Sequence, residues 1–273
     1  MEYKKIIDDH INDYLTKNIS NPNLVREVKY VLKDGKRLRP IISLDMYYSL
    51  YKKIDDKILN YSMFIEFLHN ASLIIDDLPY MDNDNIRRNQ LTLHHKYNIS
   101  TSNLISNFLI SKSLKKISLI SKSLKNNDEL VKMICQQTKM ASLGQYYDLY
   151  NKHKTIRDIC LKTSPFFIMA FVGPFLFSKN IDKKQLKDII ELAIHFSIAF
   201  QICDDIEDIH SNDINNYVKI YGLEKCIFLY KENIQNFEKL CRKMFFLSTT
   251  LKNLINLLNE KFTNCIYDQQ KHC

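Results

Sequence analysis

The sequence predicts an all-α fold in which long helices are joined by short loops. Only four glycines and five prolines occur in 273 residues, whereas an all-β or α/β chain of this length normally uses more glycine in its turns. Apolar residues make up 45% of the chain, which is enough for a sizeable core. Because no Gly-, Ser- or Pro-rich stretch suggests a linker, residues 1–273 are predicted to form a single domain.

The N-terminal part of the chain shows helical spacing and helix boundary signals. In the first predicted helix the apolar residues are Ile6, Ile7, Ile11, Tyr14 and Leu15. Asn21 followed by Pro22 is typical of a helix start, and Pro40 is expected to open a third helix. A fourth helix is predicted from Tyr61 to Leu78, because Pro79 would end it.

The remaining helices are predicted over 101–124, 128–150, 155–178, 183–209, 215–240 and 242–262. A local repeat, LISKSLK, occurs at 109–115 and again at 119–125. Its apolar residues form one helical stripe, which consists of Ile110, Leu114, Ile117, Ile120 and Leu124. We predict that this stripe faces the core and leaves the serine and lysine side chains of the repeat in solvent.

Charge and cysteine content limit the partners and the compartment. The formal net charge is +8, but no compact basic run with interleaved aromatic residues occurs, so nucleic-acid binding is not predicted. The seven cysteines contain no CxxC pair, which favours reduced thiols over a zinc site or a disulfide framework. No apolar run resembles a signal peptide or reaches the roughly 18 residues of a membrane span, so a cytoplasmic protein without a transmembrane segment is expected.

Two acidic clusters carry the chemistry. The first, DDLPYMDND, holds Asp76, Asp77, Asp82 and Asp84, and such a density of like charges needs solvation or a cation. The second, FQICDDIEDI, holds Asp204, Asp205 and Asp208, which share one face of a helix. Carboxylates without neighbouring His or Cys ligands suit Mg²⁺ or Mn²⁺ rather than zinc. Because Mg²⁺ usually adds substrate phosphates to one or two carboxylates, we predict a phosphate or diphosphate substrate.

Basic residues accompany the acidic clusters in a fixed order along the chain. GKRLRP, from Gly35 to Pro40, precedes a predicted helix, and Arg87-Arg88 directly follow the first acidic cluster. Lys162-Thr163 adds an ammonium group and a hydroxyl group in a helical stretch. Each of these motifs is weak alone, but their combination with two acidic clusters is specific.

In this combination the chain resembles the trans-prenyltransferases, or polyprenyl diphosphate synthases. The similarity runs from GKRLRP through HNASLIIDDLPYMDNDNIRRN, GQYYD at 144–148 and KT at 162–163 to FQICDDIED, and ends near NYVKIYGLEK at 216–225. The resemblance implies an isoprenoid-synthase-type helical bundle around a central cavity, usually as a homodimer. It also implies head-to-tail condensation of isopentenyl diphosphate with an allylic diphosphate such as dimethylallyl, geranyl or farnesyl diphosphate.

The resemblance also implies roles for individual residues. The catalytic set would be Asp76, Asp77, Asp82, Asp204, Asp205, Asp208 and Lys162. Two or three Mg²⁺ ions per site, or Mn²⁺ in their place, would be held by Asp76, Asp82, Asp204 and Asp208. Isopentenyl diphosphate would bind Lys36, Arg39, His69 and Arg88, and the allylic diphosphate would bind Arg87, Lys162, Thr163 and Gln201. For His69 the alternative is a histidine satisfied within an apolar helix.

The chain departs from the pattern of the family in three places. Ile214 stands where relatives carry a lysine, in a loop that is shorter than usual, and Lys219 is a candidate substitute. Residues 105–107 read ISN where the family has AGD, and Glu207 replaces a usual apolar residue. These departures leave open a catalytically weak regulatory subunit of a prenyl synthase.

By the resemblance, product length depends on the side chains below the first acidic cluster. Ser72 and Ala71 lie four and five residues before Asp76, and both are small. An aromatic ring there would limit the product near fifteen carbons, so we predict geranylgeranyl diphosphate, with twenty carbons and with Leu68 as a candidate floor. A farnesyl diphosphate synthase is the alternative. A terpene cyclase is disfavoured, because it would have little use for GKRLRP with Arg88.

Overall fold

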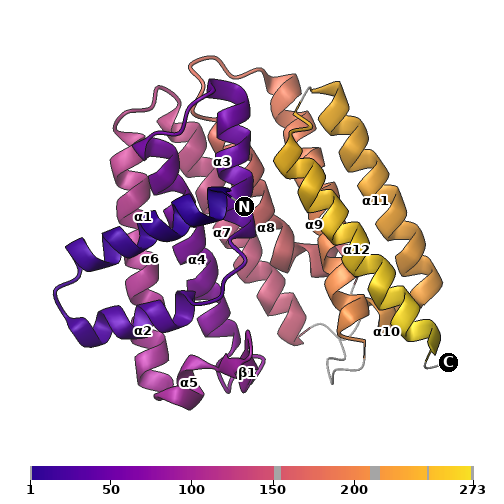
Figure 1. The fold of residues 1–273 in the computed structure, drawn as a ribbon, viewed down its shortest axis with the longest axis horizontal. Helices are drawn as coiled ribbons and strands as arrows, with labels where there is room; N and C mark the ends of the chain where they lie inside the picture. The colour runs from indigo at the N-terminus through magenta and orange to yellow at the C-terminus, as the bar shows by residue number, and fades with distance from the viewer. Residues whose placement is uncertain (1, 151–154, 210–215, 245, 272–273) are drawn as a thin grey trace. The chain divides into compact units, whose positions relative to one another are not determined.

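The computed structural model describes residues 2–150, 155–209, 216–244 and 246–271 and confirms the all-α fold (Figure 1). The helices are α1 (Glu2–Asn18), α2 (Pro22–Leu32), α3 (Leu38–Tyr51), α4 (Asp56–Asp76), α5 (Leu93–Lys96), α6 (Ile99–Ser121), α7 (Asn127–Tyr150), α8 (Ile156–Phe175), α9 (Lys183–Glu207), α10 (Tyr217–Tyr221), α11 (Leu223–Lys243) and α12 (Thr249–Lys271). The chain divides into two compact units. Unit 1 comprises residues 1–48 and 52–127, and unit 2 comprises residues 49–51 and 128–273.

Helix α4 is the core of unit 1. It starts five residues before the predicted helix, because the Asp55 carboxylate accepts hydrogen bonds from the amides of Lys57 and Ile58 at 3.1 and 3.3 Å. Within the described residues, α4 alone is long and apolar enough to cross a membrane by length and composition. Most of it is buried, and it packs against α1, α2 and α6, which is the situation of a core helix.

The prediction for the repeated LISKSLK segment was wrong in part. Ile117 and Ile120 on α6 are buried as expected, but Leu114 is 58% exposed, and Ser113 and Lys116 are buried. The reason is that α6 packs along α4 through small serine side chains, while the Lys116 ammonium finds polar and aromatic partners there. It donates a hydrogen bond to Asn60 at 2.7 Å and lies 3.8 Å from the ring centroid of Tyr14.

A short hairpin that the sequence did not predict follows the first acidic cluster. Strands β1 (Ile86–Arg87) and β2 (Gln90–Leu91) pair antiparallel. The two turn residues, Arg88 and Asn89, have φ values of 52° and 59°, as a type I′ turn requires. The Thr92 hydroxyl donates to the Asp84 carbonyl at 2.8 Å and ties the end of the hairpin to the acidic cluster.

Unit 2 is a bundle in which α9 packs against α8, α11 and α12. Its core contains edge-to-face and tilted aromatic pairs among Phe167, Phe171, Phe196 and Phe237. The helix predicted over 215–240 is divided at Gly222, whose φ of 85° suits only glycine, into α10 and α11.

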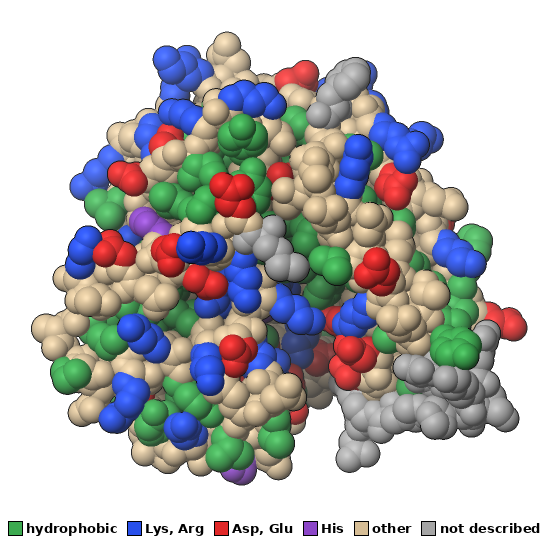
Figure 2. Space-filling view, viewed as in Figure 1, with side chains coloured by type: hydrophobic (Ala, Val, Ile, Leu, Met, Phe, Trp, Pro, Cys, Tyr) green, Lys and Arg blue, Asp and Glu red, His purple; other side chains and the backbone are tan. Residues whose placement is uncertain are grey.

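Charged side chains of both signs are interspersed over the face in Figure 2. Ion pairs between residues four apart on the same helix include Lys17 with Asp13 on α1 at 2.8 Å and Arg242 with Glu238 on α11 at 2.9 Å. Exposed pairs of this kind contribute at most about 1 kcal/mol each, so they add solubility more than stability.

Candidate active site

The first acidic cluster forms where α4 ends. Asp76 is the last residue of the helix, and Asp77 follows as its cap. The chain then folds back, so that the amide of Asp82 donates to the carbonyl of Asp76 at 2.9 Å and the amide of Asn83 donates to the carbonyl of Leu78 at 3.1 Å. These backbone bonds bring the first and third aspartates of the motif together, although five residues separate them in the sequence.

The second aspartate of this cluster, Asp77, pairs with an arginine. Asp77 is only 5% exposed, and its carboxylate lies 2.6 Å from Nε of Arg87, which also pairs with Asp84 at 3.0 Å. Burial raises the pKa of Asp77, the Arg87 guanidinium opposes this shift, and the neighbouring carboxylates of Asp84 and Asp82 add to it. Asp82 is exposed and Asp76 is half-buried, so the two expected metal ligands reach solvent more than Asp77 does.

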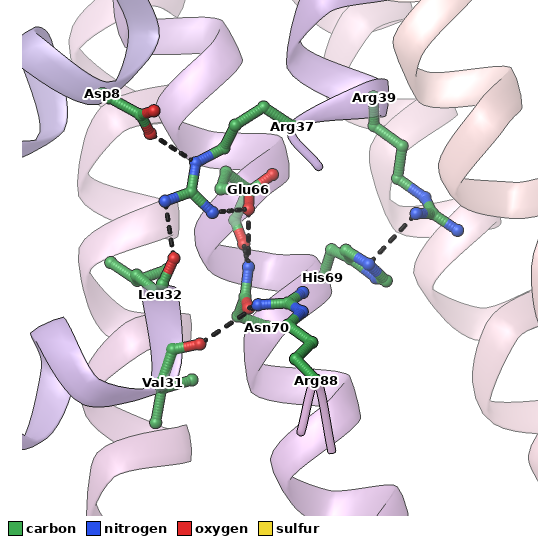
Figure 3. Close-up of polar contacts among 9 residues, drawn as sticks. All are labelled: Asp8, Val31, Leu32, Arg37, Arg39, Glu66, His69, Asn70 and Arg88. Atoms are coloured by element: carbon green, nitrogen blue, oxygen red, sulfur yellow. Dashed lines mark hydrogen bonds and ion pairs between the residues drawn. The ribbon is translucent and has the colours of Figure 1, made fainter. Parts of the chain in front are cut away.

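The residues predicted to hold isopentenyl diphosphate lie in unit 1, and three of them are brought to one place. Arg39 Nη1 lies 3.0 Å from Nε2 of His69 on α4. Arg88 contacts the next residue of α4, because its Nη1 donates to Asn70 Oδ1 at 3.1 Å. The same nitrogen donates to the Val31 carbonyl of α2 at 3.2 Å (Figure 3). The fourth residue, Lys36, has an exposed side chain in the loop before α3.

His69 is a neutral hydrogen-bond acceptor in this arrangement. Burial lowers its pKa well below the ordinary value, and the charges of Arg39 and Arg88 lower it further. Because a guanidinium can only donate, Nε2 of His69 accepts, and the proton of the ring is assigned to Nδ1. The histidine therefore orients Arg39 without adding a positive charge.

Arg37, the second basic residue of GKRLRP, has a structural role that the sequence did not indicate. Its guanidinium is buried and bonds Asp8 at 2.8 Å, Glu66 at 2.8 Å and the Leu32 carbonyl at 2.6 Å (Figure 3). A β-carbon on Gly35 would overlap this guanidinium, which explains the glycine in the motif. The acidic Glu66 inside an otherwise apolar helix was the signal in the sequence that could have identified a buried partner.

The second acidic cluster lies at the C-terminal end of α9. Asp205 is buried, and its carboxylate accepts from Gln201 Nε2 at 2.8 Å and from the Tyr217 amide at 2.7 Å. Asp204 pairs with Lys261 of α12 at 2.5 Å. Asp208 is exposed, and its amide donates to the Asp204 carbonyl at 2.9 Å.

Ile214, at the position of the missing lysine, lies outside the described residues. Lys219, the candidate substitute, is exposed on α10.

The residues predicted around the allylic diphosphate divide between the units. In unit 2, the Thr163 hydroxyl donates to Gln201 Oε1 at 2.6 Å, and Lys162 donates to Asp148 at 3.1 Å. Gln201 thereby connects Thr163 with Asp205. Arg87 belongs to unit 1, where it pairs with the first acidic cluster. That the two clusters face one another stays a prediction.

The donor chemistry of both clusters fits a hard cation. Each cluster lies at the C-terminal end of a long helix, where the helix dipole adds negative potential to that of the carboxylates. Carboxylate oxygens suit Mg²⁺, which takes one or two carboxylates and completes its shell with water and phosphate oxygens, better than they suit zinc.

The residues predicted to set product length lie on α4. Ala71 is fully buried, and its carbonyl accepts a hydrogen bond from Ser106 of α6 at 3.1 Å. Ser72 is half-buried, with its hydroxyl on the carbonyl of His69 at 2.8 Å, and Leu68 is 9% exposed. Ser106 belongs to the ISN segment, so that departure from the family pattern contacts one of the predicted length-determining residues.

Comparison with known proteins places the chain in a family. A family model described as Polyprenyl synthetase matches residues 21–222, a range that includes both acidic clusters. The chain belongs to this family. The farnesyl diphosphate synthase of Buchnera aphidicola is 31% identical over 86% of this chain and 88% of its own length. The family is magnesium-dependent and acts on isoprenyl diphosphate substrates.

Solved structures confirm the isoprenoid-synthase fold. A geranyltranstransferase from Thermotoga maritima is 25% identical, with a TM-score of 0.83 over 95% of this chain and 98% of that one. A geranyltransferase from Helicobacter pylori, in complex with magnesium and isoprenyl diphosphate, is 24% identical, with a TM-score of 0.75 over 94% and 97% of the two chains. The polyprenyl synthetase family member described here is therefore a prenyltransferase, and these relatives support a short-chain prenyl diphosphate synthase.

Proposed function

We propose that this prenyltransferase condenses isopentenyl diphosphate head-to-tail with dimethylallyl, geranyl or farnesyl diphosphate and makes geranylgeranyl diphosphate. One observation carries the proposal. In both acidic clusters the second aspartate is buried and bonded by protein groups, whereas Asp82 and Asp208 are exposed. A cluster that existed only for solubility would not bury and anchor its second aspartate.

The proposed metal ligands are Asp76, Asp82, Asp204 and Asp208, which would hold two or three Mg²⁺ ions or Mn²⁺. When bound, the metal would stabilise the charge of the departing diphosphate. The Helicobacter pylori geranyltransferase, which was solved in complex with magnesium and isoprenyl diphosphate, supports magnesium as the metal.

We assign the protein side chains to two substrates. Arg39, oriented by His69, and Arg88, oriented by Asn70, would bind isopentenyl diphosphate together with Lys36. Lys162, Thr163 and Gln201 would bind the allylic diphosphate together with Arg87. The condensation breaks the bond between the allylic carbon and its diphosphate oxygen, forms one carbon–carbon bond, and releases a proton and inorganic diphosphate.

The small side chains of Ala71 and Ser72 support the twenty-carbon product, since neither would block an elongating chain. Farnesyl diphosphate remains the alternative product, and the name of the Buchnera aphidicola relative favours it.

We further propose a cytoplasmic homodimer. Leu104, Leu114 and Leu119 on α6 are 70%, 58% and 50% exposed, which supports a covering partner, and light scattering of the purified protein would test it.

The deciding experiment is to incubate the purified protein with Mg²⁺, isopentenyl diphosphate and each allylic starter, and to identify the products by chromatography. We expect linear diphosphates of up to twenty carbons and no product after chelation of the metal. Cyclised hydrocarbons would indicate a terpene cyclase instead, and no turnover would indicate a weak regulatory subunit. Asp204→Asn should lower kcat by about 10²-fold or more, and full activity of this variant would contradict the metal role.

A further inference from the structure

A lysine from the last helix is bound by the second acidic cluster. The Lys261 ammonium lies 2.5 Å from Asp204 and 2.7 Å from Glu207, which are three residues apart on α9. Both acids and the lysine belong to unit 2. Asp204 is one of the proposed metal ligands, so a protein cation lies where the metal would bind.

The position of Lys261 is set by packing on both sides. The next residue, Phe262, stacks on Tyr230 of α11 with ring centroids 3.7 Å apart. One turn earlier, Asn259 accepts a hydrogen bond from the Tyr230 hydroxyl at 2.8 Å. The side chain of Lys261 is only 23% exposed. Since α12 is held on both sides of Lys261, the ammonium is directed at α9 and is not a mobile surface charge.

Glu207 gives this contact its second carboxylate. The sequence has a glutamate here in place of the usual apolar residue of the family pattern, and the prenyltransferase chemistry proposed above has no use for it. The Glu207 side chain is 54% exposed, and its carboxylate pairs with Lys261 at 2.7 Å. Glu207, Lys261 and Asp204 therefore form one ion-pair group, in which two carboxylates bind one ammonium.

We propose that Lys261 is an internal counter-cation of the second acidic cluster, and that Mg²⁺ binds Asp204 only by displacing it. This inference rests on the proposed metal role of Asp204. Because two cations compete for one carboxylate, the lysine weakens Mg²⁺ binding in the substrate-free protein. It also offsets part of the negative charge of the cluster until metal and diphosphate arrive together.

The first test is a calorimetric titration of the full chain with Mg²⁺. Lys261→Met should bind Mg²⁺ roughly fivefold more tightly than the wild type, because an ion pair of moderate strength no longer competes. Lys261→Arg keeps the charge and should stay within about twofold of the wild type. Lys252→Met, on the exposed side of α12, is the matched control for loss of one positive charge and should change nothing.

The second test uses the unmodified protein. Acetic anhydride labelling, followed by peptide mass spectrometry, should show Lys261 becoming more reactive when Mg²⁺ is added, with Lys252 as the unchanged reference. Equal or lower labelling of Lys261 would overturn the proposal.

Asp204→Asn separates the failure of this inference from the failure of the proposed function. If this variant weakens Mg²⁺ binding while Lys261→Met leaves it unchanged, the competition is wrong and the metal role stands. If Asp204→Asn leaves Mg²⁺ binding unchanged, the metal role of Asp204 and the competition both fall.

Discussion

Gly144 of α7 lies directly against the backbone of Lys162 in α8. A β-carbon on Gly144 would overlap the Lys162 amide nitrogen and lie 2.7 Å from the Leu161 carbonyl oxygen. The contact between α7 and α8 at this point therefore excludes any side chain. On the same helix, one turn after the glycine, Asp148 pairs with the Lys162 ammonium.

Gly144→Ala should therefore displace Lys162. We expect a loss of about 1–3 kcal/mol in the free energy of unfolding, because the clash is with backbone atoms that cannot rotate away. The KM for the allylic diphosphate should rise as the Lys162 ammonium moves. Urea unfolding and steady-state kinetics measure the two effects. Ser142→Ala, exposed on the same helix, is the control, and equal stability of the two variants would refute the close contact.

Lys36 and Arg37 are adjacent but should behave in opposite ways on substitution. Arg37→Met leaves Glu66 buried without its cation, so we expect a loss of about 3–5 kcal/mol in the free energy of unfolding. Lys36→Ala should change stability by less than about 0.5 kcal/mol, because the side chain is exposed, but should raise the KM for isopentenyl diphosphate. A stable Arg37→Met protein would contradict the structural role.

Ser72→Phe should shorten the product. Ser72 is half-buried, so a ring there would project beside α4 and limit the elongating chain, and chromatography should show fifteen carbons in place of twenty. Ala71→Phe should shorten the product too. It should also cost about 1–3 kcal/mol of stability, because Ala71 is fully buried.

Ser111→Phe, on the exposed face of α6, is the control for adding a ring and should keep the wild-type product. Unchanged product length in both α4 variants would show that these positions do not set the length.

Lys116 should make stability depend on pH. Burial, together with the charges of Lys115 and Lys112, lowers the pKa of Lys116 to about 8. The unfolded chain keeps this proton up to a pKa of about 10.4, so between these values the unfolded state binds more protons, and stability rises with pH. The difference in the free energy of unfolding between wild type and Lys116→Met should therefore be flat below pH 7 and grow in favour of the wild type from pH 8 to 10. Lys122→Met, which removes an exposed charge that is not among the causes of the Lys116 shift, should show no such change.

Local signals in the sequence were sufficient to predict where the helices lie and which motifs carry the chemistry. Asn21 caps α2 and Pro79 follows the end of α4, as predicted, because caps and breakers act over a few residues. The order of acidic and basic motifs along the chain was also enough to indicate the family, which the match over 21–222 confirmed.

The sequence by itself thus determined the helical architecture and the kind of chemistry, whereas the tertiary structure decided the role of each charged residue. Arg37 is structural because Asp8 and Glu66 meet it from 29 residues away in either direction. Lys261 reaches Asp204 across 57 residues. Helix periodicity and capping depend on neighbours along the chain, but the partner of a charge depends on which helices pack together, and no local pattern encodes that.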